Sequence, residues 1–296
     1  MSEDVVADGR AALRWKEILQ RGGAYALGAR TRIRVTGADC LRYLNGQLSN
    51  DAQKLKSGAA LQALLLTAKG KLNAVVHVWL EDDAVIVDAD PGRSEDLEAR
   101  LSRYIVADDV ELLDESTEAA GWHVFGAVSE GLPGLKINRV GEPGVDTTTK
   151  PPSGVILLSP EEYELLRITR GVPAWGSDLD ENTLPHEARL EESAVDFHKG
   201  CYVGQETVSR LQSVGRANRR LCTILGDFPL RPGLKLTTEG GDNAGTITSA
   251  ALHFELAKTV ALAYVQTRLA DSSYLVTDES GATLGHAQRH EFPLHD

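Results

Sequence analysis

One stretch of the chain, residues 199–206, combines residue types that can do chemistry. It places the thiol of Cys201 between Gly200 and Gly204, with the amine of Lys199 before it and a carboxylate after it. A cysteine acts as a nucleophile or a soft ligand when it is a thiolate, and nearby cations lower the pKa of the thiol. The glycines let the backbone turn tightly or approach a ligand closely. We therefore predict that Cys201 is a functional thiol assisted by Lys199; the alternative is a small buried side chain, the commonest fate of a free cysteine.

The same stretch and its flanking segments match the pattern of a known family. Residues 199–206 read K-G-C-Y-V-G-Q-E, and they are followed by T-V-S-R at 207–210 and G-R-A-N-R-R at 215–220. Further matching segments lie upstream, at 166–173, 184–188, 35–39, 44–51 and 69–71. Over nearly its whole length the chain resembles the YgfZ-like folate-binding proteins, which are related to the aminomethyltransferase (T-protein) of glycine cleavage. The octet at 199–206 is the specific part of this resemblance.

The resemblance implies an α+β fold with the T-protein-like folate-binding architecture, in which two α+β subdomains precede a C-terminal β-barrel. We expect the folate-binding region to cover residues 1–215, with one subdomain at approximately 52–115, and the barrel to cover 216–296. In that superfamily the three parts enclose a central channel that binds tetrahydrofolate. The expected cofactor is therefore tetrahydrofolate or a derivative.

A pterin is flat and rich in donors and acceptors, so it needs a deep slot with a few fixed polar groups. Following the resemblance, we expect the polar contacts to come from separate subdomains and the wall to be partly aromatic. The candidates are Asn50, Asn73, Gln205, Glu206, Arg210 and Arg216 for polar contacts, and Trp175 and Tyr202 for the wall. Each has a simpler alternative role as a turn former, a surface charge or a core aromatic.

One segment departs from the aminomethyltransferase pattern. The transferases place paired aspartates just beyond a glycine turn, near the folate nitrogens, whereas residues 70–75 here read G-K-L-N-A-V. Asn73 can hydrogen-bond a pterin, but an amide cannot accept a proton as a carboxylate does. Thr169 likewise stands where the transferases usually carry a glutamate. The resemblance thus implies the YgfZ-like role, which is folate-dependent maintenance or repair of iron-sulfur enzymes with effects on tRNA modification. The alternative is an aminomethyltransferase or another one-carbon transferase.

The composition limits the classes of partner. The 296 residues carry a net charge of −12, which argues against a broad nucleic-acid surface, because phosphate binding needs concentrated Lys and Arg. A local exception is the arginine cluster in 210–220, which suits a phosphate, a polyglutamate tail or a carboxylate as well as a solvated strand edge. We expect a monomer whose partners are reduced folate and iron-sulfur client or assembly proteins.

Other chemistry finds little support in the sequence. The three cysteines, Cys40, Cys201 and Cys222, leave an odd number without short spacings, so we expect neither a disulfide framework nor a metal site. There is no phosphate loop and no dinucleotide fingerprint. Residues 1–9 are acidic and polar, unlike a signal peptide, and apolar runs such as 61–68 are too short to span a bilayer. We expect a cytoplasmic protein.

Periodicity and turn residues predict a mixed order of helices and strands. Helices are expected at 11–20, 39–48, 93–104 and 161–168, and strands at 31–35, 61–67, 72–80 and 84–87. Residues 131–153 are rich in Gly, Pro and Thr and are expected to be a loop or a subdomain boundary. Beyond residue 219, short β-rich runs alternate with turns, as in a small barrel, at 221–225, 246–250, 259–265, 274–277 and 283–286.

Overall fold

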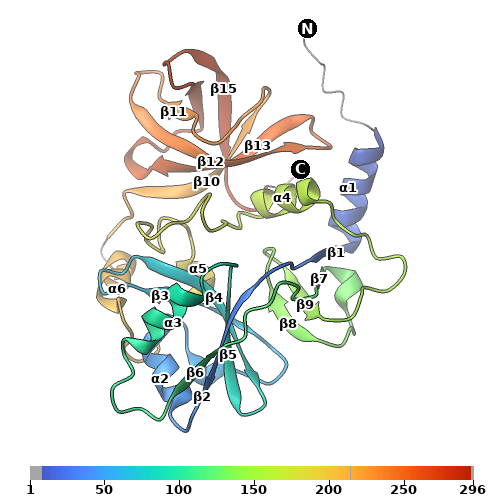
Figure 1. The fold of residues 1–296 in the computed structure, drawn as a ribbon. Helices are drawn as coiled ribbons and strands as arrows, with labels where there is room; N and C mark the ends of the chain where they lie inside the picture. Colours follow the sequence, from blue (N-terminus) through green and yellow to red (C-terminus); the bar gives the residue numbers. More distant parts are fainter. Residues whose placement is uncertain (1–8, 214, 295–296) are drawn as a thin grey trace.

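A five-stranded antiparallel sheet forms the first part of the fold (Figure 1). The structure is a computed structural model and describes residues 9–213 and 215–294. In spatial order the strands are β3 (Leu61–Leu66), β4 (Leu72–Glu81), β5 (Ala84–Ala89), β2 (Thr31–Thr36) and β6 (Glu111–Asp114). The helices α2 (Cys40–Gln47) and α3 (Ser94–Ser102) pack against this sheet through a shared apolar core. The sequence predicted all of these elements except β6.

Strand β4 shows why this sheet has two different faces. Successive side chains of a strand point to opposite sides. On one side, Ala74, Val76 and Val78 are buried in the core shared with α2 and α3. On the other side, Asn73 and His77 are only partly buried. This second face, with its polar side chains, turns toward the remaining parts of the molecule.

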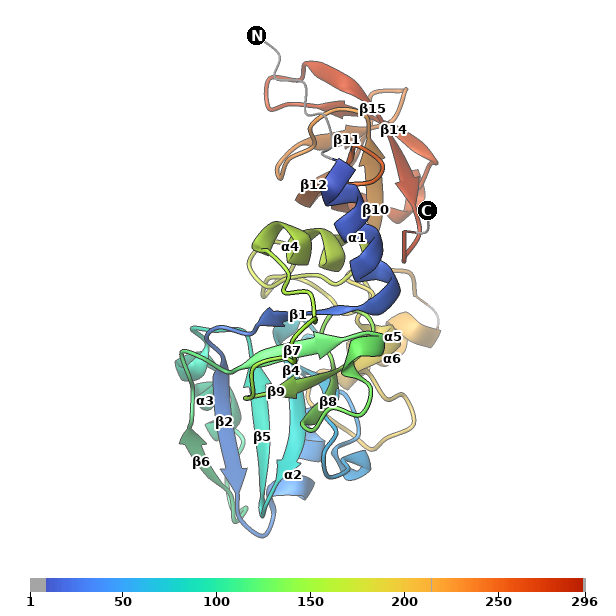
Figure 2. The same cartoon turned by 90° about the vertical axis from the view of Figure 1, so that its right-hand side faces the viewer.

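A second antiparallel sheet lies beside the first (Figure 2). Its strands, in spatial order, are β1 (Gly23–Ala26), β7 (Trp122–Phe125), β9 (Pro143–Thr147) and β8 (Leu135–Asn138). The expectation that residues 131–153 contain no regular element was wrong, because β8 and β9 pair there. The glycines of this segment suggested a loop, but not all of them serve turns. At Gly144 an added Cβ would lie 2.6 Å from the His123 ring. Glycine is needed at this position for close packing rather than for a turn.

Helix α4 (Pro160–Thr169) lies between the two sheets and the C-terminal barrel (Figure 1). It begins with a capping box, in which the hydroxyl of Ser159 accepts from the Glu162 N–H and the Glu162 carboxylate accepts from the Ser159 N–H. Two further helices were not predicted, namely α5 (Glu191–Ala194) and α6 (Gln205–Ser213). Short 3-10 helices cover Ala52–Lys54, Ala127–Ser129 and Thr267–Leu269.

Six strands close a barrel in the C-terminal part. In spatial order they are β10 (Arg219–Gly226), β13 (Lys258–Gln266), β12 (Asn243–His253), β11 (Lys235–Thr237), β14 (Ser273–Thr277) and β15 (Thr283–His290). The predicted barrel is confirmed, and only the three-residue strand β11, too short to show periodicity, was missed. The domain boundaries at 215 and 216 stay a prediction; residues 1–8, 214, 295 and 296 lie outside the described residues.

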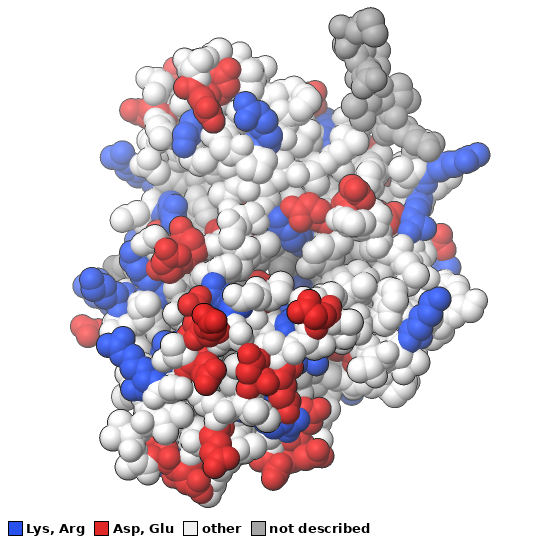
Figure 3. Space-filling view, in the orientation of Figure 1, with Lys and Arg blue, Asp and Glu red and all other residues white. Residues whose placement is uncertain are grey.

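The surface charge follows the acidic composition. In Figure 3 the Asp and Glu side chains gather over the lower half of this face, the part that holds α2, α3 and β6. Among the residues that the structure describes, none of the helices combines the length and the apolar character that a bilayer crossing requires. The opening segment that we judged unlike a signal peptide falls almost entirely in residues 1–8, outside the described part.

The N-terminal helix α1 (Gly9–Arg21) packs against the barrel. Its buried side chains are Trp15 and Ile18. Trp15 is fully buried and makes edge contacts with the rings of His253 and Phe254, whose centroids lie 6.1 and 6.0 Å away. Leu13, on the same helix, is 71% exposed. Trp15 therefore fills the junction between α1 and the end of β12.

We expect Trp15→Ala to lower the free energy of unfolding by about 3–5 kcal/mol, because it leaves a large cavity in the core. Leu13→Ala is the matched control on the exposed face and should change that energy by less than about 0.5 kcal/mol. Urea unfolding followed by circular dichroism measures both. Equal losses in the two variants would contradict the packing role of Trp15.

Candidate functional site

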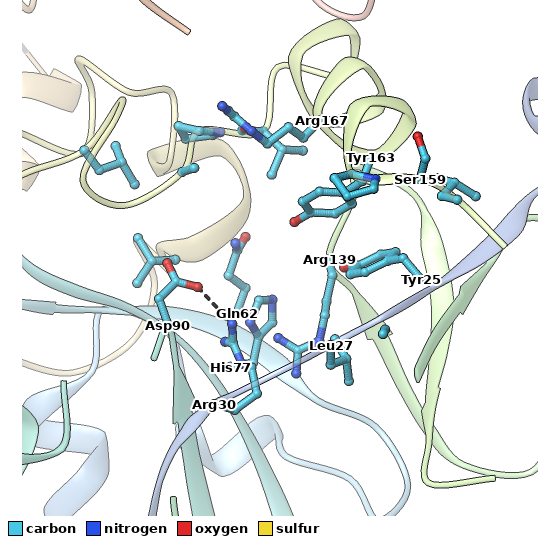
Figure 4. A pocket seen from close by; sticks show the side chains of 18 residues that line it. Tyr25, Leu27, Arg30, Gln62, His77, Asp90, Arg139, Ser159, Tyr163 and Arg167 are labelled. Atoms are coloured by element: carbon cyan, nitrogen blue, oxygen red, sulfur yellow. Dashed lines mark hydrogen bonds and ion pairs between the residues drawn. The ribbon is translucent and has the colours of Figure 1, made fainter. Parts of the chain in front are cut away.

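A cavity of about 550 Å³ lies between the two sheets, α4 and the loop that follows α4 (Figure 4). Its wall is assembled from segments that are far apart in the sequence. The polar and aromatic side chains that line it are Tyr25, Arg30, Gln62, His77, Asp90, Arg139, Ser159, Tyr163 and Arg167. This volume is typical of small-molecule sites, which span about 300–1,000 Å³.

Two tyrosines form the aromatic side of the cavity. Tyr25 projects from β1 and Tyr163 from α4, and their ring centroids are 4.4 Å apart with a tilt of 45°. Burial raises the pKa of both phenols, so they stay neutral at physiological pH. The pair therefore presents an uncharged surface against which a flat ring can pack.

An ion-pair network supports the cavity from below. Asp88 on β5 is fully buried and pairs with Arg30 at 2.7 Å, Arg32 at 3.2 Å and Arg139 at 3.0 Å. Burial by itself would raise the pKa of Asp88, but Arg139 and Arg30 lower it to about 2. Arg139 also pairs with Asp146 on β9 at 2.7 Å. Since Asp88 belongs to the first sheet and Asp146 to the second, this network joins the two sheets.

The charges of this network are balanced. Arg30 also pairs with Asp90 at 2.9 Å, as the dashed line in Figure 4 marks. The three arginines of the network thus face three carboxylates, those of Asp88, Asp90 and Asp146. The floor is polar without an excess of positive charge, whereas a phosphate site concentrates uncompensated cations.

Arg167 connects the cavity to the barrel. Its guanidinium donates to the Asp178 carboxylate at 2.7 Å and to the Ser249 hydroxyl of β12 at 2.7 Å. Tyr264 on β13 donates to the Asp178 carbonyl at 2.9 Å. These bonds hold α4, and with it Tyr163, at a fixed place on the barrel. All three parts of the fold therefore determine the shape of the cavity.

His77 contributes a neutral acceptor to the cavity. Its Nε2 lies 3.1 Å from the Asn138 carbonyl oxygen, which can only accept, so Nε2 carries the hydrogen. Burial, with a further contribution from Arg139, lowers the pKa of His77 to about 3. Nδ1 therefore keeps a free lone pair at physiological pH. Figure 4 shows the ring in the cavity, beside Gln62 and Arg30.

None of the ten side chains predicted from the sequence lines this cavity, but two of them lie beside it. Asn73 precedes the lining residue Val75 on the same face of β4, and its Oδ1 is buried without a hydrogen-bond partner. Arg93 donates to the Asn73 carbonyl at 2.6 Å and stacks on Trp175 at 4.0 Å. The structure thus brings Asn73 and Trp175 together next to the cavity. The Asn73 Oδ1 is the acceptor there that still lacks a hydrogen-bond donor.

Segment 199–206 has a different environment from the one we predicted for it. Cys201 is exposed. The Lys199 ammonium donates to the carbonyls of Asn45 and Leu48, both at 2.6 Å, and of Asn50, at 2.9 Å. Burial lowers the pKa of Lys199 to about 8. Lys199 therefore ties this segment to the end of α2, because its three donors are all used by backbone carbonyls.

The remaining candidates lie apart from the cavity. Asn50 donates to a backbone carbonyl of β3 at 2.8 Å and accepts from the next N–H at 2.9 Å, so its amide is used structurally. Tyr202 is buried in the core, and the centroid of its ring lies 5.1 Å from the Lys199 ammonium. Gln205, Glu206, Arg210 and Arg216 follow on α6 and the linker to β10, the last three exposed.

The cavity residues were missed because they come from segments that are far apart in the sequence, between residues 25 and 179. The sequence does contain one local pattern that points to the cavity. His77 and Asp88 are ionisable residues within largely apolar strands, and ionisable side chains are rarely buried unless they are paired. Two such residues on neighbouring strands indicate a polar site on the sheet.

Comparison with known proteins gives two kinds of relative; no family model matches the chain. An uncharacterized protein of Haemophilus influenzae is 31% identical over 207 residues, which cover 65% of this chain and 69% of that protein. The iron-sulfur cluster assembly factor IBA57 homolog of Chaetomium globosum is 27% identical over 253 residues, which cover 71% of this chain. The chain spans 58% of the length of this fungal relative.

Among solved structures, the chain is similar to the glycine cleavage system aminomethyltransferase T from Bartonella henselae. The TM-score is 0.75 at 20% sequence identity, and the match covers 94% of this chain and 88% of that one. At this identity the match establishes the fold. It confirms the predicted T-protein-like architecture of two α+β parts and a barrel.

The lowered pKa of His77 makes stability depend on pH with a defined sign. The ordinary pKa of histidine is about 6.5, so between that pH and pH 3 the unfolded chain binds a proton that the folded ring excludes. Stability therefore falls as pH decreases through this window. We expect His77→Gln to reduce the slope of unfolding free energy between about pH 7 and pH 5, by up to about 1.4 kcal/mol per pH unit.

The measurement is urea unfolding of the wild-type protein and the variant at several pH values in this window. His286→Gln, at an exposed position, is the control and should keep the wild-type slope. An unchanged slope in His77→Gln would show that the ring is not excluded from protonation in the folded protein.

Proposed function

Because this chain belongs to the YgfZ-like family, which is related to the aminomethyltransferase of glycine cleavage, we propose that its central cavity binds a reduced folate. The ligand is tetrahydrofolate or a derivative. The observation that carries this proposal is the 550 Å³ cavity between the two sheets, α4 and the loop that follows α4. A reduced folate, when bound there, supplies a carrier of one-carbon units.

The lining residues fit a pterin better than a phosphate. Tyr25 and Tyr163 offer an uncharged wall for a flat ring. The free Nδ1 of His77, in the lining, and the unpartnered Oδ1 of Asn73, beside the lining residue Val75, are acceptors that suit the N–H and amino groups of a pterin. The ion pairs beneath the cavity are balanced in charge, so this part of the cavity suits an uncharged ring better than an anion.

We further propose that the protein supports the assembly or repair of iron-sulfur enzymes, with Cys201 as its functional thiol. The relative from Chaetomium globosum, named an iron-sulfur cluster assembly factor, supports this role. Cys201 is exposed, whereas Cys40 and Cys222 are buried, and burial raises the pKa of Cys222 to about 11. An open thiol is the one that a client or assembly protein can reach.

For the partners, the downstream effects, the location and the oligomeric state, we propose what the family resemblance implies. Iron-sulfur client or assembly proteins are the partners, effects on tRNA modification are downstream of them, and the protein acts as a cytoplasmic monomer. Lys199 takes part by positioning, since its ammonium holds the segment that carries Cys201 against the end of α2. This differs from the catalytic partnership that the sequence suggested for Lys199.

An aminomethyltransferase or another one-carbon transferase is the weaker alternative. Positioned acid-base groups contribute about 10²–10⁴-fold to such reactions. Here Asp88 and Asp90 are both engaged by Arg30, and Asn73 stands in place of a carboxylate. His77, with its pKa near 3, is not a proton donor at physiological pH. The geometry therefore favours folate binding without efficient transfer.

Purified protein should bind 5-formyltetrahydrofolate in a calorimetric titration. Tyr163→Ala should weaken binding about tenfold, because aromatic contacts contribute about 0.5–1.5 kcal/mol beyond area burial and 1.4 kcal/mol is tenfold in affinity. Tyr104→Ala, at a half-buried tyrosine outside the cavity, is the control and should bind as the wild type does. Absence of binding for every reduced folate tested, mono- or polyglutamylated, would end the proposal.

Cys201→Ala should abolish the support of iron-sulfur enzyme activity in a complementation assay while changing stability by less than about 0.5 kcal/mol, since the side chain is exposed. Cys222→Ala should do the reverse, costing about 1 kcal/mol through a small core void but keeping activity. Complementation and melting curves measure the two properties. Full complementation by Cys201→Ala would remove the thiol from the function.

A further inference from the structure

A second cavity, of about 390 Å³, lies where α5, α6 and the start of β10 meet. Its polar lining comes from His186, Glu191, Gln212, Arg216, Arg220 and Thr267. None of these residues lines the central cavity. The second cavity is therefore separate from the proposed folate site.

Two residues that line this second cavity, Glu191 and His186, each carry a buried acceptor without a partner. Glu191 is 7% exposed, and its Oε1 accepts from Arg220 at 2.9 Å, whereas its Oε2 is buried without a hydrogen bond. His186 is 5% exposed, and its Nδ1 is likewise buried and unpartnered. A buried polar group without a hydrogen bond is destabilising, so such atoms usually have a ligand or a water as a partner.

The protonation of these groups can be read from their surroundings. His186 Nε2 lies 3.4 Å from Gln212 Oε1, an acceptor, so Nε2 carries the hydrogen and Nδ1 keeps its lone pair. Burial lowers the pKa of His186, which keeps the ring neutral. Burial raises the pKa of Glu191, as expected for a carboxylate that has too few cationic partners. Glu191 Oε2 and His186 Nδ1 can therefore both accept a hydrogen bond, and a cationic donor would suit them best.

The lining of the second cavity also includes a cation, Arg216. Arg216 is exposed, and within residues 9–213 and 215–294 it makes no ion pair or hydrogen bond. It also lines an adjoining hollow together with Gln266 and Arg268. A guanidinium in this state is suited to a carboxylate ligand. The second cavity is thus lined both by residues with unmet acceptors and by a cation that is available to a ligand.

We propose that the second cavity binds a small zwitterion of the α-amino acid class. The ammonium group lies against Glu191 Oε2 and His186 Nδ1, and the carboxylate lies against Arg216. The volume of about 390 Å³ is sufficient for such a molecule.

Ligands of a single charge fit this arrangement less well. A phosphate or a lone carboxylate would meet the buried Glu191 carboxylate, which repels it. A divalent metal ion would need several hard or imidazole ligands, and among the residues that the structure describes no group of three His, Cys, Asp or Glu side chains can hold one. A zwitterion supplies an ammonium group for the unmet acceptors and a carboxylate for Arg216.

The experiment titrates the full-length protein, saturated with 5-formyltetrahydrofolate, with each of the common free L-amino acids by calorimetry. We expect at least one to bind with one-to-one stoichiometry. Its N-acetyl derivative, which lacks the ammonium, and its decarboxylated amine should each bind at least about tenfold more weakly, since a charge-assisted hydrogen bond contributes about 1.5–3 kcal/mol.

Variants assign the binding to this cavity. Arg216→Ala, at an exposed position that folding tolerates, and Glu191→Gln should each weaken binding at least about tenfold. The matched controls are Arg231→Ala and Glu192→Gln; Arg231 and Glu192 are exposed and line neither cavity. Both controls should bind as the wild type does.

Three results would overturn the proposal. No amino acid of the panel binds, in which case the buried acceptors are satisfied by water alone. The blocked analogues bind as tightly as the free amino acid, in which case no zwitterion is recognised. The control variants weaken binding as much as Arg216→Ala and Glu191→Gln do, in which case binding lies elsewhere. None of these results bears on whether the folate itself binds, so the two proposals fail separately.

Discussion

The buried pairing of Asp88 with Arg139 is the interaction on which the central cavity depends. Asp88 lies on β5 of the first sheet, and Arg139 directly follows β8 of the second sheet. Without this pair, a carboxylate that is fully buried would keep only Arg30 and Arg32, and breaking a buried ion pair typically costs about 3–5 kcal/mol. The ion pairs therefore fix the distance between the sheets, and that distance sets the width of the cavity.

The cavity and the thiol lie in different places, so the two functions that we propose for them are spatially separate. The cavity is polar but balanced in charge, so it suits an uncharged ring and lacks a free carboxylate for acid-base work. Cys201 lies on the surface, in a segment that Lys199 holds against α2. A ligand in the cavity and a protein partner at the thiol would not exclude each other. This arrangement suits an accessory protein better than a self-contained transferase.

The sequence predicted the fold better than the site, for physical reasons. Local signals fix local elements: the alternation in β4 and the capping box of Ser159 with Glu162 are both visible in the chain itself. The site depends on contacts between distant segments, such as Tyr25 with Tyr163, which no local pattern encodes. The signature at 199–206 also attracted candidates whose polar groups the fold uses elsewhere, as the three backbone bonds of the Lys199 ammonium show.

The central claim is that a reduced folate occupies the cavity between the sheets and α4. A crystal structure of the protein with 5-formyltetrahydrofolate tests it most directly. We expect density for the pterin against Tyr25 and Tyr163, with its N–H and amino groups toward His77 and Asn73. Density for the ligand outside this cavity, or an empty cavity in crystals of a protein that binds the folate in solution, would contradict the account.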